Sequence, residues 1–409
     1  MVNTCGFIDA AKEESIDALL EAADVAARRG ARLAAVGCLV ERYRGELEPE
    51  LPEVDLWCGL DLAPLLAAFE RWAGPDAALE RTETGGRGPG ASAEPAAGRR
   101  RGGAAASPAR SRPRPVSAYV KVSDGCDRRC AYCAIPLIKG DYEAVPPAEV
   151  LAQARAALAE GARELVLVGQ DTSRYDAPGY GGLERLLADV AALGPAWVRL
   201  LYLQPDGLDA RLLEAMSRHT LPYVDVPLQH ASRRVLTAMG RRGDGEAYLG
   251  LLAQVRRALP GATVRSTFLV GFPGETETDV DELVAFVEEA RLAVAGVFAF
   301  DAQEGTRAAA LDGQVPEDLR LERAARVGAA IDRAAAPHWE GLVGRTVEAL
   351  VEHARRGQPS AAVGRIAAQA PDVDGIALLE GPRLRRGRLC RVRVVAAQGY
   401  DVTAEVEAR

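Results

Sequence analysis

The chain contains 409 residues, of which 48% are hydrophobic, and it carries a formal net charge of −8. This length allows two to four domains with cores of their own, and the acidic balance argues against indiscriminate nucleic-acid binding by the whole molecule. No apolar run approaches the ~20 residues that a membrane-spanning helix needs, and no secretory signal opens the chain. Seven cysteines in such a chain favour metal-bound thiolates over disulfides, so we expect a cytoplasmic metalloenzyme.

Residues 1–74 alternate helix and strand patterns. Apolar residues recur at helical spacing over Asp9–Arg29, and Leu62–Trp72 has a second helical pattern. Between these helices, Arg32–Cys38 and Val54–Gly59 have the composition of strands. Strands separated by helices predict a parallel α/β sheet, in which ligands gather beyond the carboxyl ends of the strands.

Three cysteines of this region lie where predicted strands end. Cys5 and Cys38 could converge at one edge of the sheet, although either of them alone would more often be an ordinary buried cysteine. Cys58 lies at a third strand end, and its place beside Trp57 favours a buried core residue.

Residues 75–115 differ in composition from the rest of the chain. They hold seven glycines and six prolines, no aromatic residue, and eight arginines against four acids. Such a segment cannot bury enough apolar surface to offset its chain entropy. It is predicted to be a disordered linker, with incidental attraction to RNA as the alternative.

Residues 116–338 repeat a strand pattern followed by a helix pattern. Six strands are predicted, at Tyr119–Ser123, Glu164–Gly169, Trp197–Leu203, Tyr223–Leu228, Thr263–Val270 and Gly296–Phe300. Helical patterns fill the gaps, for example over Leu183–Leu193, Leu208–Arg218 and Thr278–Ala290. Six such units predict a partial (βα)6 barrel, whose site lies at the carboxyl ends of the strands.

The loop after the first of these strands contains Cys126, Cys130 and Cys133, spaced C-x3-C-x2-C. Three thiolates are too few for a closed tetrahedral zinc site. They suit a [4Fe–4S] cluster in which the fourth iron stays open for a substrate or cofactor. A zinc site with a distant fourth ligand from one of the four histidines is the alternative, but the spacing, Tyr132 and the preceding strand favour the cluster.

Polar residues gather at the ends of the other predicted strands. They include Gln170, Gln204, Gln229–His230 and the segment Gly271–Glu275. Any one of them could equally cap a loop or form a turn. Together they predict a binding site at the carboxyl end of the barrel.

Residues 339–409 have short alternating strand patterns, such as Val343–Glu352 and Leu389–Val395, with turns between them. They predict a small β-barrel. The segment Arg383–Arg393 holds six arginines in eleven residues. A solvated basic face is the usual meaning of such a run, but its contrast with the acidic chain favours a binding surface. We expect Cys390 to be structural.

The cysteine loop resembles the signature of the radical S-adenosylmethionine (AdoMet) enzymes. In that family the open iron binds AdoMet, and one electron cleaves it to give a 5′-deoxyadenosyl radical. The family places an aromatic residue just before the last cysteine, and Tyr132 matches it. The resemblance implies that Tyr132 contacts the adenine of AdoMet.

The segments Asn3-Thr-Cys5-Gly-Phe-Ile and Gly37-Cys38-Leu resemble the amino-terminal domain of the methylthiotransferases, a radical AdoMet subfamily. The resemblance implies a second iron–sulfur cluster with Cys5 and Cys38 among its ligands. The family's first cysteine lies in an earlier Gly-Cys-x-Lys-Asn unit, which this sequence lacks. We therefore expect a truncated amino terminus and an incomplete second cluster site. A functional two-cysteine site, or Cys58 as a substitute ligand, is the alternative.

Three further stretches resemble the ribosomal methylthiotransferases. They are Glu14-Ser-Ile, Gln170-Asp-Thr-Ser-Arg-Tyr and Pro227-Leu-Gln-His-Ala-Ser. The resemblance implies transfer of a methylthio group to the β-carbon of an aspartate in small-subunit ribosomal protein twelve. A tRNA adenosine methylthiotransferase is the first alternative. A non-catalytic iron–sulfur or zinc-binding module is the second.

The same resemblance implies two [4Fe–4S] clusters and AdoMet as cofactors. Gln170, Gly271 and Glu275 would contact AdoMet or the substrate. It also implies a small-subunit ribosomal protein as substrate, an electron donor such as flavodoxin or ferredoxin, no membrane, and a monomer.

The expected architecture is thus an α/β protein in four parts. Residues 1–74 form an incomplete parallel α/β cluster domain, and residues 75–115 form the linker. Residues 116–338 form the partial (βα)6 radical AdoMet barrel. Residues 339–409 form a small all-β barrel similar to a TRAM domain.

Overall fold

The computed structural model describes residues 1–73, 115–354 and 360–407. The expected linker lies outside the described residues except for Pro115. The chain forms two compact units, and each is described by itself. None of the helices in the described ranges is long and apolar enough to cross a membrane.

The amino-terminal region contains a three-stranded parallel sheet in the order β1-β2-β3, as expected. Its strands are β1 (Val2–Thr4), β2 (Ala34–Gly37) and β3 (Leu56–Cys58), and its helices are α1 (Asp9–Arg29), α2 (Cys38–Glu50) and α3 (Ala63–Ala73). Leu19, Leu33, Ala35 and Trp57 pack together in its core. Helix α2 was not predicted, because its buried apolar residues, Leu39 and Val40, both lie in its first turn and leave no helical periodicity.

The second unit is built on six parallel strands, which confirms the partial barrel. Their order is β4-β7-β10 in one sheet and β11-β12-β13 in the other. The strands are β4 (Ser117–Lys121), β7 (Glu164–Val168), β10 (Trp197–Leu200), β11 (Tyr223–Asp225), β12 (Thr263–Val270) and β13 (Val294–Ala299). Backbone hydrogen bonds join the facing edges, from Leu221 N–H to Val198 O (2.8 Å) and from Leu203 N–H to Asp225 O (3.0 Å).

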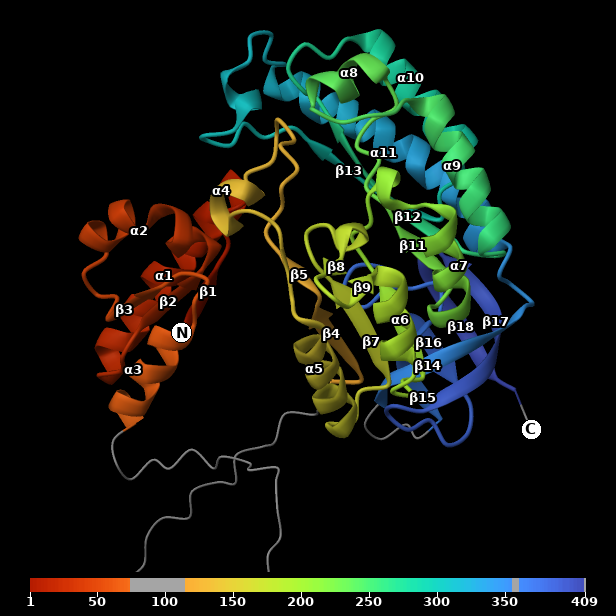
Figure 1. Cartoon of the computed structure of the whole chain (residues 1–409), viewed down its shortest axis with the longest axis horizontal. Coiled ribbons are helices and arrows are strands. Elements are labelled where there is room, and N and C mark those ends of the chain that lie inside the picture. The colour runs from red at the N-terminus through yellow and green to blue at the C-terminus, as the bar shows by residue number, and fades with distance from the viewer. Residues whose placement is uncertain (74–114, 355–359, 408–409) are drawn as a thin grey trace, which may run out of the picture. The chain divides into compact units, whose positions relative to one another are not determined.

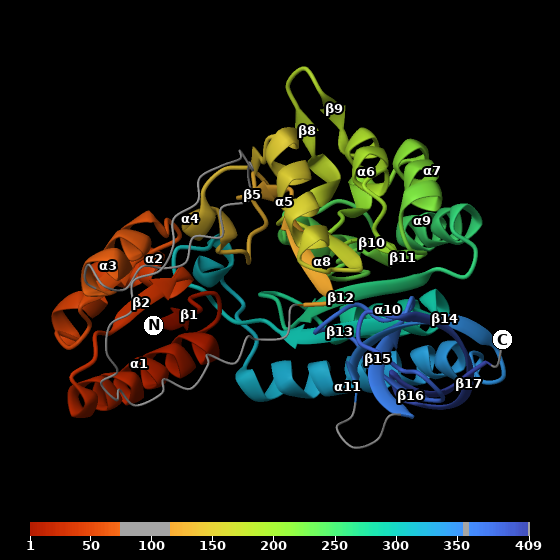
Figure 2. The ribbon, with the colours of Figure 1, turned by 90° about the horizontal axis from the view of Figure 1, so that it is seen from below.

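Helices cover the outer face of these strands (Figures 1 and 2). They are α5 (Pro147–Ala159), α6 (Leu183–Ala191), α7 (Ala210–His219), α9 (Gly245–Ala258), α10 (Glu277–Ala290) and α11 (Glu317–Glu340). Shorter elements lie in the loops, namely β5 (Ser123–Asp124), β6 (Glu143–Ala144), β8 (Asp176–Ala177), β9 (Gly181–Gly182), α4 (Ile135–Lys139) and α8 (Arg233–Ala238).

Alternation along β4 separates the two faces of the barrel wall. Val120, at 1% exposure, joins the core beneath the helices. Tyr119 and Lys121 point to the opposite face, into the lumen, because successive side chains of a strand alternate. The lumen therefore receives polar side chains from strands whose outer faces are apolar.

The described residues after the last long helix form a closed five-stranded barrel in the order β14-β15-β16-β18-β17, as the sequence predicts. The strands are β14 (Thr346–Ala354), β15 (Ala361–Ile366), β16 (Ala377–Glu380), β17 (Leu389–Gln398) and β18 (Asp401–Val406). Val351, Leu379, Val392 and Cys390 are buried in its core, which confirms the structural place of Cys390.

A buried ion network fixes this small barrel to the base of the parallel strands. Glu164 on β7 accepts hydrogen bonds from Arg199 of β10 at 2.8 Å and from Arg365 of β15 at 2.5 Å. The side chains of all three are at most 2% exposed. Burial opposes ionisation of Glu164, but the two guanidinium groups prevail and hold the pKa of its carboxyl below the ordinary value.

Glu164→Gln should lower the apparent free energy of unfolding at pH 7 by about 3–5 kcal/mol, because it removes the carboxylate that faces the buried Arg199 and leaves Arg365 with only Glu352 of its two carboxylate partners. A carboxyl with a depressed pKa stabilises the fold above its ordinary pKa of about 4.3 and loses that effect as the pH falls further. The difference in the free energy of unfolding between wild type and variant should therefore become smaller in acid. Urea denaturation at several pH values measures this difference.

Glu288→Gln is the matched control, since Glu288 forms an exposed pair with Arg333 and should change stability by less than about 1 kcal/mol. Equal destabilisation by the two substitutions would contradict the assigned role of the network. A loss of unfolding free energy in Glu164→Gln that does not depend on pH would contradict it as well.

Candidate active site

The loop that carries the three cysteines follows β4 directly and is held by its own backbone. Gly125 has a φ of +67°, and a Cβ there would lie 2.0 Å from the carbonyl oxygen of Asp141, so only glycine fits. The Cys126 N–H donates to Gly140 O at 3.1 Å. The Ala131 N–H donates to Met239 O at 2.8 Å. These contacts fix both ends of the loop without engaging a thiol.

Arg128 ties the middle of the loop to two neighbouring strands. Its Nε donates to Asp171 Oδ2 at 2.6 Å, in the loop after β7. Its two Nη atoms bind both oxygens of Asp206, after β10, at 2.9 and 2.8 Å. The Asp171 side chain is fully buried, which makes this pair costly to break. These hydrogen bonds therefore hold the cysteine loop at the carboxyl ends of the barrel strands.

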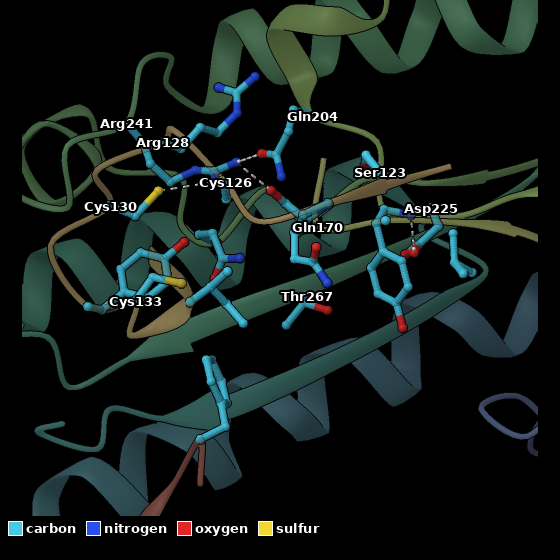
Figure 3. A pocket seen from close by; sticks show the side chains of 18 of the residues that line it. Ser123, Cys126, Arg128, Cys130, Cys133, Gln170, Gln204, Asp225, Arg241 and Thr267 are labelled. Carbon is cyan, nitrogen blue, oxygen red and sulfur yellow. Dashed lines mark hydrogen bonds between the residues drawn. The ribbon is translucent and has the colours of Figure 1, made fainter. Parts of the chain in front are cut away.

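A second arginine approaches the loop from the other side. Arg241, which follows α8, donates to Gln204 Oε1 at 2.9 Å and to Pro227 O at 2.8 Å. Its other Nη lies 3.9 Å from the Cys130 sulfur. Figure 3 shows Arg241 between Cys130 and Gln204. Arg241 therefore links the cysteine loop to the segments that follow β10 and β11.

The three cysteines line a single cavity of about 700 Å³ in the lumen of the barrel (Figure 3). Tyr132, Gln170, Gln204 and Gln229 line the same cavity, so seven of the residues that the sequence places at the site come together there. Every strand of the barrel contributes to the wall, through Tyr119, Lys121, Ser123, Val168, Gly169, Tyr202, Gln204, Asp225, Pro227, Gln229, Arg265, Thr267 and Phe298.

Two thiols of the loop, those of Cys126 and Cys133, favour the protonated form because they are buried. Burial raises the pKa of Cys126 and raises that of Cys133 to about 11. Thiolate is the form that binds iron, so metal binding there must displace protons. Burial also raises the pKa of the Tyr132 hydroxyl, which keeps it neutral.

The donor set suits a cluster better than a single ion. Within the described ranges, no group of three or more His, Cys, Asp or Glu side chains is close enough to hold one metal ion. Three thiols on one fixed loop around a cavity fit a [4Fe–4S] cluster whose fourth iron stays open.

Two predicted contacts lie elsewhere. Gly271 and Glu275 are not among the described residues that line the cavity. Glu275 Oε1 accepts hydrogen bonds from the Gly271 N–H at 2.8 Å and from Arg323 at 3.1 Å, and its carboxylate faces the buried His230 Nε2 at 3.4 Å. This arrangement holds the loop after β12 in shape.

The amino-terminal cysteines follow strand ends, as predicted. Cys5 and Cys38 come directly after Thr4 and Gly37, which are partners in the β1–β2 register. Cys58 ends β3, is 2% exposed and lies 2.6 Å from the carbonyl oxygen of Asp61. Its burial agrees with the interpretation of Cys58 as a core residue.

The sequence did not reveal several residues of the cavity. Lys121, Arg265 and Thr267 are inward positions of predicted strands, so alternation could have identified them. Tyr202 lies in the wall with a φ of 60°. Gln229, which the sequence did place at the site, lies there with a φ of 70°, and nothing in either residue type predicts this backbone conformation. Such outliers are common at functional sites.

Three family models match the chain. The Radical SAM superfamily matches residues 120–287, the TRAM domain matches residues 343–406, and Uncharacterized protein family UPF0004 matches residues 1–59. Among solved structures, the coproporphyrinogen III oxidase of Escherichia coli, described as a radical SAM enzyme, aligns with a TM-score of 0.42 and 14% identity over 57% of this chain and 55% of that one.

Curated relatives match over nearly the whole chain. The ribosomal protein uS12 methylthiotransferase RimO of Desulforudis audaxviator is 42% identical over 99% of this chain and 88% of its own length. The enzymes of the same name from Nocardioides sp. and Moorella thermoacetica are each 40% identical, over 99% and 100% of this chain and 88% and 90% of their own lengths. The chain therefore belongs to the ribosomal protein uS12 methylthiotransferase family within the radical SAM superfamily.

Proposed function

We propose that this chain adds a methylthio group to the β-carbon of an aspartate in ribosomal protein uS12. The observation that carries the proposal is the single cavity lined by three thiols of one fixed loop, in a chain about 40% identical to uS12 methylthiotransferases throughout its length.

The target bond explains why such a cavity is needed. An aspartate β-C–H bond has no accessible pKa, so a general base is a poor means of breaking it. A [4Fe–4S] cluster and AdoMet supply a carbon radical that abstracts the hydrogen without creating charge. The protein's part is to hold these groups, position the aspartate and exclude water.

The residues divide between these tasks. Cys126, Cys130 and Cys133 would hold the cluster. Tyr132 and Gln170 would contact AdoMet, since both line the same cavity. Gly271 and Glu275, named by the sequence for the same role, would instead support the shape of the wall, because their hydrogen bonds run to each other and to Arg323.

A second [4Fe–4S] cluster is proposed at the amino-terminal sheet, with Cys5 and Cys38 among its ligands. The support is their common position after paired strand ends, where ligands of parallel sheets gather. The division into a cluster domain at 1–74, a linker at 75–115, a barrel at 116–338 and a TRAM-like barrel at 339–409 remains our proposal. So do a flavodoxin or ferredoxin as electron donor, a monomeric state and a cytoplasmic location.

Incubation of the reconstituted enzyme with AdoMet, reductant and either uS12 or tRNA tests the proposed function. Mass spectrometry should find a methylthio group on one aspartate of uS12 and none on tRNA. A methylthio group on a tRNA adenosine instead would make this a tRNA enzyme. Iron and sulfide absent from the reconstituted protein would leave only a non-catalytic module.

Cys130→Ala should abolish AdoMet cleavage and remove about four irons per chain, because a cluster with one open iron needs all three thiolates. Cys390→Ala is the matched control. It removes a buried thiol of the carboxy-terminal barrel and should keep both iron and cleavage. Formation of 5′-deoxyadenosine by purified Cys130→Ala under reducing conditions would show that the cluster lies elsewhere.

A further inference from the structure

The charges around the cavity are unevenly compensated. Four cationic side chains line it in the described part of the chain, namely Lys121, Arg128, Arg241 and Arg265. Arg128 and Arg241 already hold the cysteine loop: the first binds two carboxylates, and the second binds two oxygens and faces Cys130. Neither is placed to serve a substrate anion without releasing the loop.

Arg265 is also engaged. Its Nη1 lies 3.1 Å from Asp225 Oδ1, and its Nε lies 3.6 Å from Asp374 Oδ1. Both carboxylate side chains are at most 4% exposed. Arg265 therefore faces two buried carboxylates with one positive charge, so no positive charge is left over for a third carboxylate.

Lys121 differs from the three arginines. Its Nζ lies 2.7 Å from Asp124, but the ammonium of Lys139 binds the same carboxylate at 2.9 Å. Two ammonium groups thus share one carboxylate, which leaves a net positive charge. The Lys139 side chain is 19% exposed and outside the cavity wall, whereas the Lys121 side chain is 50% exposed and in it. The surplus charge is therefore available on Lys121.

We propose that the Lys121 ammonium binds the carboxylate of the aspartyl side chain that the enzyme modifies. This inference rests on the proposed function and names a positioning residue for it. A carboxylate that enters the cavity loses part of its hydration, and an ammonium group in the cavity wall supplies a counter-charge there. Lys121 lies on β4, the strand that leads into the cysteine loop. The β-carbon is bonded directly to the carboxylate carbon, so an anchored carboxylate restricts where the β-C–H bonds lie.

The test compares two substrates, uS12 with its natural aspartate and uS12 with asparagine at that position, by kcat/KM for hydrogen abstraction and methylthio transfer. Wild type should prefer aspartate, because only aspartate pairs with the ammonium. Lys121→Gln should lower kcat/KM for aspartate by about 10- to 100-fold, the usual range for a hydrogen bond to a charged group, and should affect asparagine far less. The preference for the aspartate substrate over the asparagine substrate should therefore largely disappear.

Three further variants complete the design. Lys121→Arg keeps the charge and should restore most of the preference. Lys121→Met removes the charge at similar length and should act like Lys121→Gln, which guards against a folding defect in one variant. Lys139→Gln tests the charge count itself: it leaves Lys121 paired with Asp124 alone, so the surplus charge is lost and the preference for aspartate should weaken.

An unchanged preference in both neutral variants would overturn the inference while leaving the proposed function intact. If the neutral variants cleaved AdoMet more slowly without substrate and lost kcat/KM equally for both substrates, Lys121 would serve the AdoMet carboxylate, which also overturns the inference. Failure of wild type to modify either substrate would instead refute the proposed function.

Discussion

The site depends on one partly buried ion pair, between Arg128 and Asp171. The arginine lies inside the cysteine loop, and the aspartate follows a strand 43 positions later in the chain. Because Asp171 is fully buried, removing the Arg128 charge would leave its carboxylate without that partner, at a cost of several kcal/mol. The pair and the bidentate contact to Asp206 fix where three thiols stand relative to the lumen. Arg241 can then reach both Cys130 and Gln204.

The carboxy-terminal barrel also supports the strands that form the cavity, through hydrogen bonds from two tyrosines to its aspartates. The Tyr119 hydroxyl donates to Asp372 Oδ2 at 2.9 Å, and the Tyr223 hydroxyl donates to Asp374 Oδ2 at 2.7 Å. Asp374 also faces Arg265, which lines the cavity. A loop of the small barrel therefore lies one side chain away from the lumen. Together with the Glu164 network, it makes the two barrels a single rigid support for the site.

Strand positions in the barrel could be predicted from sequence because alternation and helical spacing are local: Thr263–Val270 is both the predicted and the observed β12. The meeting of Cys126, Cys130 and Cys133 at one cavity could be predicted because their spacing is itself the signal. Arg128 and Arg241 could not, since their roles arise from partners far along the chain. Glu275 shows the converse limit. A polar residue after a strand can face the cavity or brace the loop, and only the loop geometry, here set by Arg323, decides between them.

Transfer of deuterium is the most direct measure of whether this cavity brings a carbon radical to an aspartate side chain. Ribosomal protein uS12 with β-deuterated aspartate would be incubated with the reconstituted enzyme, AdoMet and reductant, and the 5′-deoxyadenosine examined by mass spectrometry. The expected result is deuterated 5′-deoxyadenosine in proportion to the methylthio groups formed. Methylthio transfer with no deuterium in 5′-deoxyadenosine would contradict hydrogen abstraction from the aspartate β-carbon.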